Sequence, residues 1–179
     1  MRTLRLLAFL AAWLMLWIGP ALAEDLYVAQ TAAGAADGSN CANARAVTFF
    51  NTAGNWGAGA NKISAGDTVY LCGTLTTALS AQGSGSVGNV ITISPAPGTT
   101  ATIDGQNVAG FTGINFTGKS YITLTGVTGD KVAGDTSYGL KIVNIAASAG
   151  TNAYCVYENN GGTFINVLHV ECSGSSTAS

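Results

Sequence analysis

Alternation of apolar and small polar residues at strand period is the feature that most limits how this chain can fold. It is clearest over residues 113–127, Gly-Ile-Asn-Phe-Thr-Gly-Lys-Ser-Tyr-Ile-Thr-Leu-Thr-Gly-Val, where two alternating bursts flank a bend at residues 117–120. Successive side chains leave opposite faces of a strand, so this period predicts strands with one buried face. Similar bursts recur at residues 90–93, 101–103, 140–143, 154–157 and 164–170. Short strands at short intervals, with no helical segment between them, predict an all-β chain that winds in coils.

The first 23 residues have the pattern of a secretory signal peptide. Two arginines precede an apolar run over residues 6–18, and Ala21-Leu22-Ala23 has the small-x-small form of a cleavage site. A transmembrane anchor is the alternative, but the run is short of the roughly 20 apolar residues that a span needs. We therefore divide the chain into a signal peptide, residues 1–23, and one domain, residues 24–179. We expect a secreted, periplasmic or extracellular protein with no membrane anchor after cleavage.

The charge of the mature chain bears on its partners. Without the signal peptide, 156 residues remain, enough for one domain with a sizeable core. They carry five Lys and Arg against nine Asp and Glu, a formal charge of −4. Because the basic residues do not cluster, the sequence argues against nucleic-acid binding.

All four cysteines belong to the mature chain, and an even number after a signal peptide indicates disulfides. Among the three possible connectivities we choose the two local pairs, Cys41 with Cys72 and Cys155 with Cys172. A zinc site is the alternative. It has little support, because there is no Cys-x-x-Cys and His169 is the single histidine.

One segment of the mature chain has a helical pattern. Val47, Phe50 and Ala53 lie three residues apart, which predicts a short amphipathic helix from a cap at Asn43 to about Asn55. We expect this helix to cover the open end of the stack of coils, where core side chains and backbone groups are exposed. Packing on one flank is the alternative.

Later coils predict which side chains point inward. A corner near Leu168 would divide residues 164–172 into two strands. The residues expected to point inward are then Ile165, Val167, Val170 and Cys172, and those expected to point outward are Asn166, His169 and Glu171. The spacing from Gly113 to Gly139 predicts a coil of 26 residues, but the repeat is imperfect. The next coil could start at Gly139 or at Ala153.

Several phrases along residues 26–128 share an order and spacing. They are Tyr27-Val28-Ala29, Ala65-Gly66-Asp67-Thr68-Val69-Tyr70-Leu71, Gly88-Asn89-Val90-Ile91-Thr92-Ile93, Ile103-Asp104-Gly105 and Gly118-Lys119-Ser120-Tyr121-Ile122-Thr123-Leu124. Together they resemble the N-terminal part of secreted right-handed parallel β-helix proteins, the pectate-lyase-like superfold. The resemblance implies a three-faced right-handed solenoid, export and frequent work on polysaccharides. One fold carries many activities, so the resemblance is specific for fold rather than for function.

The catalytic side of this resemblance is mostly missing. Pectate lyases of this kind bind calcium through several Asp on one sheet and use Arg, or in one lineage Lys, as base. The mature chain has a single arginine, Arg45, in the expected cap. The motifs of polygalacturonase-like hydrolases, Asn-Thr-Asp, paired Asp, Gly-His-Gly and Arg-Ile-Lys, are absent. No catalytic residue of these families can be assigned to a position here.

Two clusters are candidates for chemistry. Asp130 and Asp135 flank Lys131, and two carboxylates can bind calcium or act as an acid–base pair, with Lys131 as a possible base. A solvated loop is the alternative. His169 and Glu171 are two residues apart, so we expect them to share an outward face, where a His with a carboxylate can transfer protons. A surface pair is the alternative here.

Aromatic and turn residues give weaker signals. Tyr154 and Tyr157 suggest a platform on which sugar rings stack, but their spacing predicts opposite faces and so at least one core residue. Asp104 in Ile-Asp-Gly fits a turn.

Two hypotheses about function follow. The first is an exported protein associated with extracellular polysaccharide, a lyase or hydrolase whose catalytic coils are not evident in this sequence. The second is a non-enzymatic glycan-binding, surface or adhesin-type scaffold. No cofactor is evident apart from calcium at the two Asp candidates, and the oligomeric state is not predicted. Because a Ser-rich tail follows the last strand and nothing covers the last coil, we expect the domain to be truncated at its C-terminus.

Overall fold

The structure is a computed structural model that describes residues 23–127, 138–148 and 150–174. Its strands are β1 (Asp25–Ala29), β2 (Arg45–Ala46), β3 (Thr68–Leu75), β4 (Leu79–Ser80), β5 (Ile91–Pro95), β6 (Ala101–Asp104), β7 (Thr112–Asn115), β8 (Ile122–Thr125), β9 (Leu140–Ile145), β10 (Tyr154–Tyr157), β11 (Ile165–Leu168) and β12 (Val170–Gly174). Its helical elements are η2 (Cys41–Asn43), α2 (Val47–Phe50) and η3 (Ala53–Asn55). Within the described ranges no helix is long and apolar enough to cross a membrane. The prediction of an all-β chain is confirmed.

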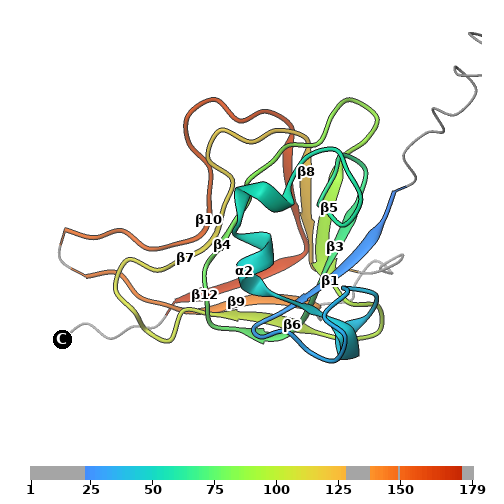
Figure 1. Cartoon of the computed structure of the whole chain (residues 1–179). Helices are drawn as coiled ribbons and strands as arrows, with labels where there is room; N and C mark the ends of the chain where they lie inside the picture. The colour runs from blue at the N-terminus through green and yellow to red at the C-terminus, as the bar shows by residue number, and fades with distance from the viewer. Residues whose placement is uncertain (1–22, 128–137, 149, 175–179) are drawn as a thin grey trace, which may run out of the picture.

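Parallel strand pairs build three sheets. The first sheet has the order β2-β1-β3-β5-β8-β11. The second sheet runs from the last residues of β3 through β6 and β9 to β12, and the third sheet has the order β4-β7-β10. From β3 onward the strands visit the first, second and third sheets in turn, and then begin again. Figure 1 shows the three sheets on three sides of α2.

The ladders show how much chain separates equivalent positions. On the first sheet the equivalent residues are Thr68, Thr92, Thr123 and Asn166. Their separations are 24, 31 and 43 residues. The predicted coil of 26 residues from Gly113 to Gly139 is therefore wrong, since Gly113 lies in β7 on the third sheet and Gly139 directly precedes β9 on the second. The loops between sheets absorb the differences in length, while the ladders keep their register.

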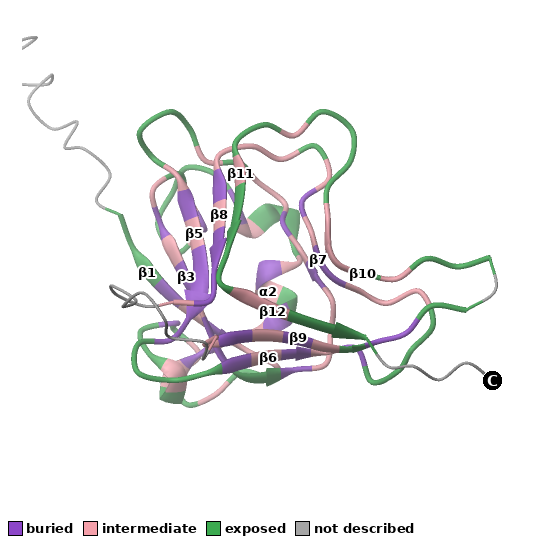
Figure 2. Ribbon diagram, turned by 180° about the vertical axis from the view of Figure 1, so that it is seen from behind, coloured by how far each residue is buried: buried purple, intermediate pink, exposed green. Residues whose placement is uncertain are grey.

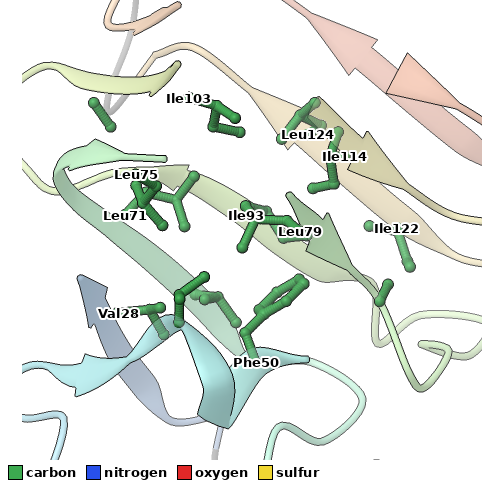
Figure 3. Packing of buried hydrophobic residues seen from close by; sticks show 14 of the residues in the cluster. Val28, Phe50, Leu71, Leu75, Leu79, Ile93, Ile103, Ile114, Ile122 and Leu124 are labelled. Atoms are coloured by element: carbon green, nitrogen blue, oxygen red, sulfur yellow. The ribbon is translucent and has the colours of Figure 1, made fainter. Parts of the chain in front are cut away.

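The three sheets share one apolar core. On the first sheet Leu26, Val69, Ile93 and Leu124 stand in register, and each is at most 1% exposed. Figure 3 shows Ile93 and Leu124 of this sheet in one cluster with Ile103 from the second sheet and Ile114 from the third. Burying an aliphatic side chain of this size stabilises the fold by about 1.5–3 kcal/mol. The strand-period alternation of the sequence thus divides the chain into an apolar interior and a polar exterior.

The last described strands follow the predicted phase. Ile165 and Val167 stand in register with Ile122 and Leu124, and Val170 and Cys172 with Leu140 and Ile142. The corner between β11 and β12 is His169, whose φ is +52°. In Figure 2, β11 is coloured mostly as exposed beside the buried β8. Val167 is 45% exposed, because no further described strand lies over it.

The predicted helix over residues 43–55 is wrong in length. α2 has only four residues, and Asn43 ends the separate 3₁₀ helix η2. Asn51 stops α2 because its side chain bonds to a distant strand: its Oδ1 accepts from the Ser80 backbone N–H (2.8 Å) and its Nδ2 donates to the Ala78 carbonyl (2.9 Å). These long-range hydrogen bonds outweigh the local helical pattern.

The short α2 nevertheless covers one end of the core. Val47 and Phe50 are buried and belong to the core cluster. The Phe50 ring meets the Trp56 ring edge to face at 4.9 Å, and Trp56 Nε1 donates to the Phe50 carbonyl (2.6 Å). Figure 1 shows α2 in front of the interior that the sheets surround, beside β1 and β4. This is the position expected of a capping helix.

Both predicted disulfides are present in the structure. Cys41–Cys72 joins η2 to β3 with a Cα–Cα distance of 5.6 Å. Cys155–Cys172 joins β10 to β12 with a Cα–Cα distance of 6.0 Å. The first bridge links the segment before α2 to β3, and the second links the third sheet to the second sheet. Each bridge therefore fixes a long-range contact.

Candidate functional site

The first group of candidates, Asp130, Lys131 and Asp135, lies outside the described residues. The calcium and acid–base hypotheses for them remain predictions. In the part of the chain that the structure describes, no group of three or more His, Cys, Asp or Glu is placed to hold a metal ion.

The second group of candidates lies on β12 and at its start. Glu171 pairs in the ladder with Lys141 on β9, and Lys141 Nζ lies 3.2 Å from Glu171 Oε2. Both side chains are more than 40% exposed, so this ion pair contributes about 0–1 kcal/mol. His169 precedes the strand at the corner. The described contact of Glu171 is therefore with a lysine of the neighbouring strand, which the sequence analysis did not find.

Arg45 also has local partners. Its guanidinium lies over the Phe49 ring at 4.4 Å and donates from Nη2 to Asn61 Oδ1 (3.2 Å). These contacts fasten the segment around α2, at the covered end of the core.

A groove lies on the outer face of the first sheet. Its volume is about 450 Å³, and its walls are the outward side of β3, β5 and β8 and the turn after β5. Figure 2 shows these three strands side by side. The lining residues are Thr68, Tyr70, Thr92, Ser94, Pro97, Gly98, Thr125 and Val127.

Strand alternation explains why this face carries hydroxyl groups. Thr68, Thr92 and Thr123 form one outward column in the ladder and are partly exposed. Strands in a sheet lie about 4.8 Å apart, so the column presents a hydroxyl at each such step. Ser94 and Thr125 stand in the next column and form the floor of the groove, 2% and 9% exposed.

Two tyrosines stand at one end of this face. Tyr27 on β1 and Tyr70 on β3 are ladder partners, and their ring centroids are 4.8 Å apart with a tilt of 37°. Both rings pack against a small outer cluster that includes Cys72 of the first disulfide. Burial, followed by the charge of Asp25 and the neighbouring Tyr27, raises the pKa of Tyr70. Its phenol therefore stays protonated at neutral pH and keeps its hydrogen-bond donor.

The lining of the groove is polar but uncharged. None of its eight described lining residues is charged, and none is a His or Cys. Hydroxyl groups donate and accept hydrogen bonds, and an aromatic ring offers an apolar face. General acid–base catalysis needs a titratable group within reach of the substrate, and Tyr70 is the one such side chain among these eight.

The sequence contained a signal for this groove that was missed. Thr-Val-Tyr at residues 68–70, Thr-Ile-Ser at 92–94 and Thr-Leu-Thr at 123–125 repeat the same outward–inward–outward pattern. The sequence alone did not place the three triplets side by side, because their separations of 24 and 31 residues differ.

The structure also places the other weighed residues. Tyr154 and Tyr157 were expected on opposite faces, with at least one of them in the core. Their ring centroids are 4.8 Å apart and Tyr154 is 37% exposed. The expectation of a core residue is wrong, because Tyr157 is also only partly buried and neither ring belongs to the core cluster. Asp104 has the predicted turn role, since its Oδ1 accepts from the Gln106 N–H and from Asn144 Nδ2, each at 2.8 Å.

Comparisons with known proteins identify no relative. No protein-family model matches the chain, and neither curated proteins nor solved structures gave a match. The resemblance to pectate-lyase-like proteins therefore remains a prediction from the residues that carry it.

Proposed function

We propose that the described strands are coils of a right-handed parallel β-helix. The chain visits the first, second and third sheets in a repeated order, and every ladder between them is parallel. Connections between parallel strands of one sheet are right-handed in about 98% of cases, which supports the handedness. An experimental structure with left-handed turns would contradict this proposal.

We propose that this protein is exported and binds neutral polysaccharide through the outer face of the first sheet. The observation that carries the proposal is the uncharged, hydroxyl-lined groove with the Tyr27–Tyr70 pair at its end. The signal-like first 23 residues and the two disulfides support export.

The groove suits a sugar chain for two physical reasons. A sugar ring has an apolar face that can pack on an aromatic ring, and Tyr70 offers such a ring beside its hydroxyl. The sugar hydroxyls can exchange hydrogen bonds with the partly exposed Thr68 and Thr92, which both donate and accept. The open groove lets a long chain lie across several strands.

The absence of charge among the lining residues selects between classes of polysaccharide. An acidic chain brings a carboxylate at many sugars, and binding it without an Arg, Lys or metal ion leaves each desolvated charge uncompensated. A neutral chain has no such cost. Of the two hypotheses from the sequence, the glycan-binding scaffold is the one that the groove favours.

Binding measurements on the full mature chain test this proposal. We expect retardation in affinity gels by neutral polysaccharides such as β-glucan or dextran, and none by polygalacturonate. Tyr70→Ala removes a ring contact and a hydrogen bond, each worth about 1 kcal/mol, so we expect affinity to fall about tenfold or more. Tyr70→Phe keeps the ring and loses only the hydrogen bond, about fivefold.

Tyr154→Ala on the third sheet is the matched control, because it removes an exposed tyrosine that is not part of the groove lining. Equal losses in the Tyr70 and Tyr154 variants would contradict the proposal, as would binding of polygalacturonate alone. Release of unsaturated sugar products that stops in Lys131→Ala would favour the lyase hypothesis instead.

A further inference from the structure

Asp67 is a buried carboxylate at the start of the first sheet. It is 3% exposed and directly precedes β3. Its Oδ1 accepts from the backbone N–H of Glu24 (2.8 Å), and its Oδ2 accepts from the backbone N–H of Ser64 (2.7 Å). Between described residues the recorded ion pair is Lys141–Glu171, so Asp67 has no cationic side chain among them. A buried charge in a fold usually has a cationic partner.

Glu24 is the residue that follows the predicted cleavage site after Ala23. In the uncut chain its nitrogen is a neutral amide. Hydrolysis breaks the Ala23–Glu24 peptide bond: the oxygen of water joins the Ala23 carbonyl carbon, and the nitrogen of Glu24 gains hydrogen to become an amine. That amine takes a further proton from solvent at neutral pH.

We propose that Asp67 receives the new N-terminus, so that cleavage after Ala23 creates an ion pair between the Glu24 α-ammonium and the Asp67 carboxylate. The inference rests on export by signal cleavage, but not on glycan binding. Signal cleavage would thus place a positive charge beside the buried Asp67 carboxylate.

The geometry needs no rearrangement for this pair. The distance of 2.8 Å from Glu24 N to Asp67 Oδ1 lies within the range of charge-assisted hydrogen bonds, about 2.7–2.9 Å. Glu24 is held in place from its other side, because the Thr68 N–H donates to the Glu24 carbonyl (3.0 Å). The next residue, Asp25, then pairs with Thr68 in the ladder.

The surroundings suit a cation. A pocket of about 630 Å³ adjoins the site, and its lining includes Glu24, Ser64 and Asp67. The pocket gives the two remaining ammonium hydrogens access to water. The side chains of Glu24 and Asp25 add negative charge beside the new amine and also favour its protonated form.

Thermal unfolding of four chains tests the inference. Two chains begin at Glu24 and two begin at Ala23. In each pair, one chain keeps Asp67 and the other carries Asp67→Asn. In the chain that begins at Ala23, the α-ammonium lies one residue earlier and the nitrogen of Glu24 is again an amide. We expect the Glu24 start to melt about 3–6 °C above the Ala23 start, and Asp67→Asn to abolish that difference. Equal melting temperatures of the two starts, or a difference that survives in Asp67→Asn, would overturn the pair.

A second measurement does not depend on whether Asp67→Asn folds. Acylation of the Glu24 amine is compared in the folded and urea-unfolded Glu24 chain, with the lysines of the same chain as internal reference. Pairing that stabilises the ammonium by one pKa unit slows the reaction about tenfold. A folded Glu24 amine that reacts as fast as the unfolded one would refute the inference, and so would exported protein whose first residue is not Glu24.

Discussion

Removal of the Cys41–Cys72 disulfide gives a quantitative test of how the cap and the first sheet are joined. The bridge closes a loop with a sequence separation of 31 residues, and Cys155–Cys172 closes one of 17. A cross-link stabilises mainly by reducing the entropy of the unfolded chain, which gives roughly 3.7 kcal/mol for the longer loop and roughly 3.1 kcal/mol for the shorter. We therefore expect Cys41→Ala/Cys72→Ala to be the more destabilised double variant, by about 0.5 kcal/mol.

Thermal melts followed by circular dichroism measure this difference. For a chain of this size 1 kcal/mol corresponds to about 2–4 °C, so the first variant should melt roughly 7–15 °C below the parent. Cys155→Ala/Cys172→Ala is the matched control, because it removes the same atoms from a shorter loop. Non-reducing peptide mapping checks the pairing first. Free thiols at both Cys41 and Cys72 would refute it, and a loss below about 1 kcal/mol would refute the entropic reasoning.

Four further outcomes follow from the same contacts. N-terminal sequencing of exported protein should begin at Glu24, and a start at the initiator methionine would exclude cleavage after Ala23. Ile93→Ala should cost about 2–5 kcal/mol in a denaturant melt, while Thr92→Ala on the opposite face of β5 should cost less than about 1 kcal/mol; equal losses would contradict the assigned faces. Because the pKa of Tyr70 is raised above its ordinary value of 10.0, folding favours its neutral form. The contribution of Tyr70 to the free energy of unfolding is then fully present below pH 10 and falls as pH rises further. Tyr70→Phe should remove this pH-dependent part, which thermal melts of the parent and the variant at several pH values above 10 would detect. Polygalacturonate with calcium should give no unsaturated product, as followed by ultraviolet absorbance, and turnover would reinstate the lyase hypothesis.

The strands were predictable because they depend on a local, two-residue period. Residues 154–157 were predicted as a strand and form β10 with the same bounds. The corner near Leu168 was found for the same reason, since the apolar phase changes there. The helix over residues 43–55 was not predictable in length, because Asn51 bonds to residues 27 and 29 positions away.

The candidate site was harder to predict because it depends on register. The outward hydroxyls of three strands were visible as triplets, but loops of unequal length separate them. Tyr27 and Tyr70 are 43 residues apart in the sequence and adjacent in the ladder. Lys141 and Glu171 are likewise ladder partners from different strands. A pattern with a period of two residues specifies which face a side chain takes, but not which neighbour it meets.

The start of the first sheet links the proposed processing to the proposed binding face. Tyr70 lies on the same strand as Cys72, and Asp67 directly precedes that strand. On the neighbouring strand, Tyr27 follows Glu24 by three residues. The Glu24–Asp67 pair thus fastens the start of β1 to the start of β3, and the Cys41–Cys72 disulfide ties η2 to β3 beyond the two rings. Both fastenings depend on events that accompany export, since disulfides form in oxidising compartments and the α-ammonium arises by cleavage. The Tyr27–Tyr70 platform should therefore be held most rigidly in the mature, oxidised chain, and a chain that lacks either fastening should bind glycan less tightly before it unfolds.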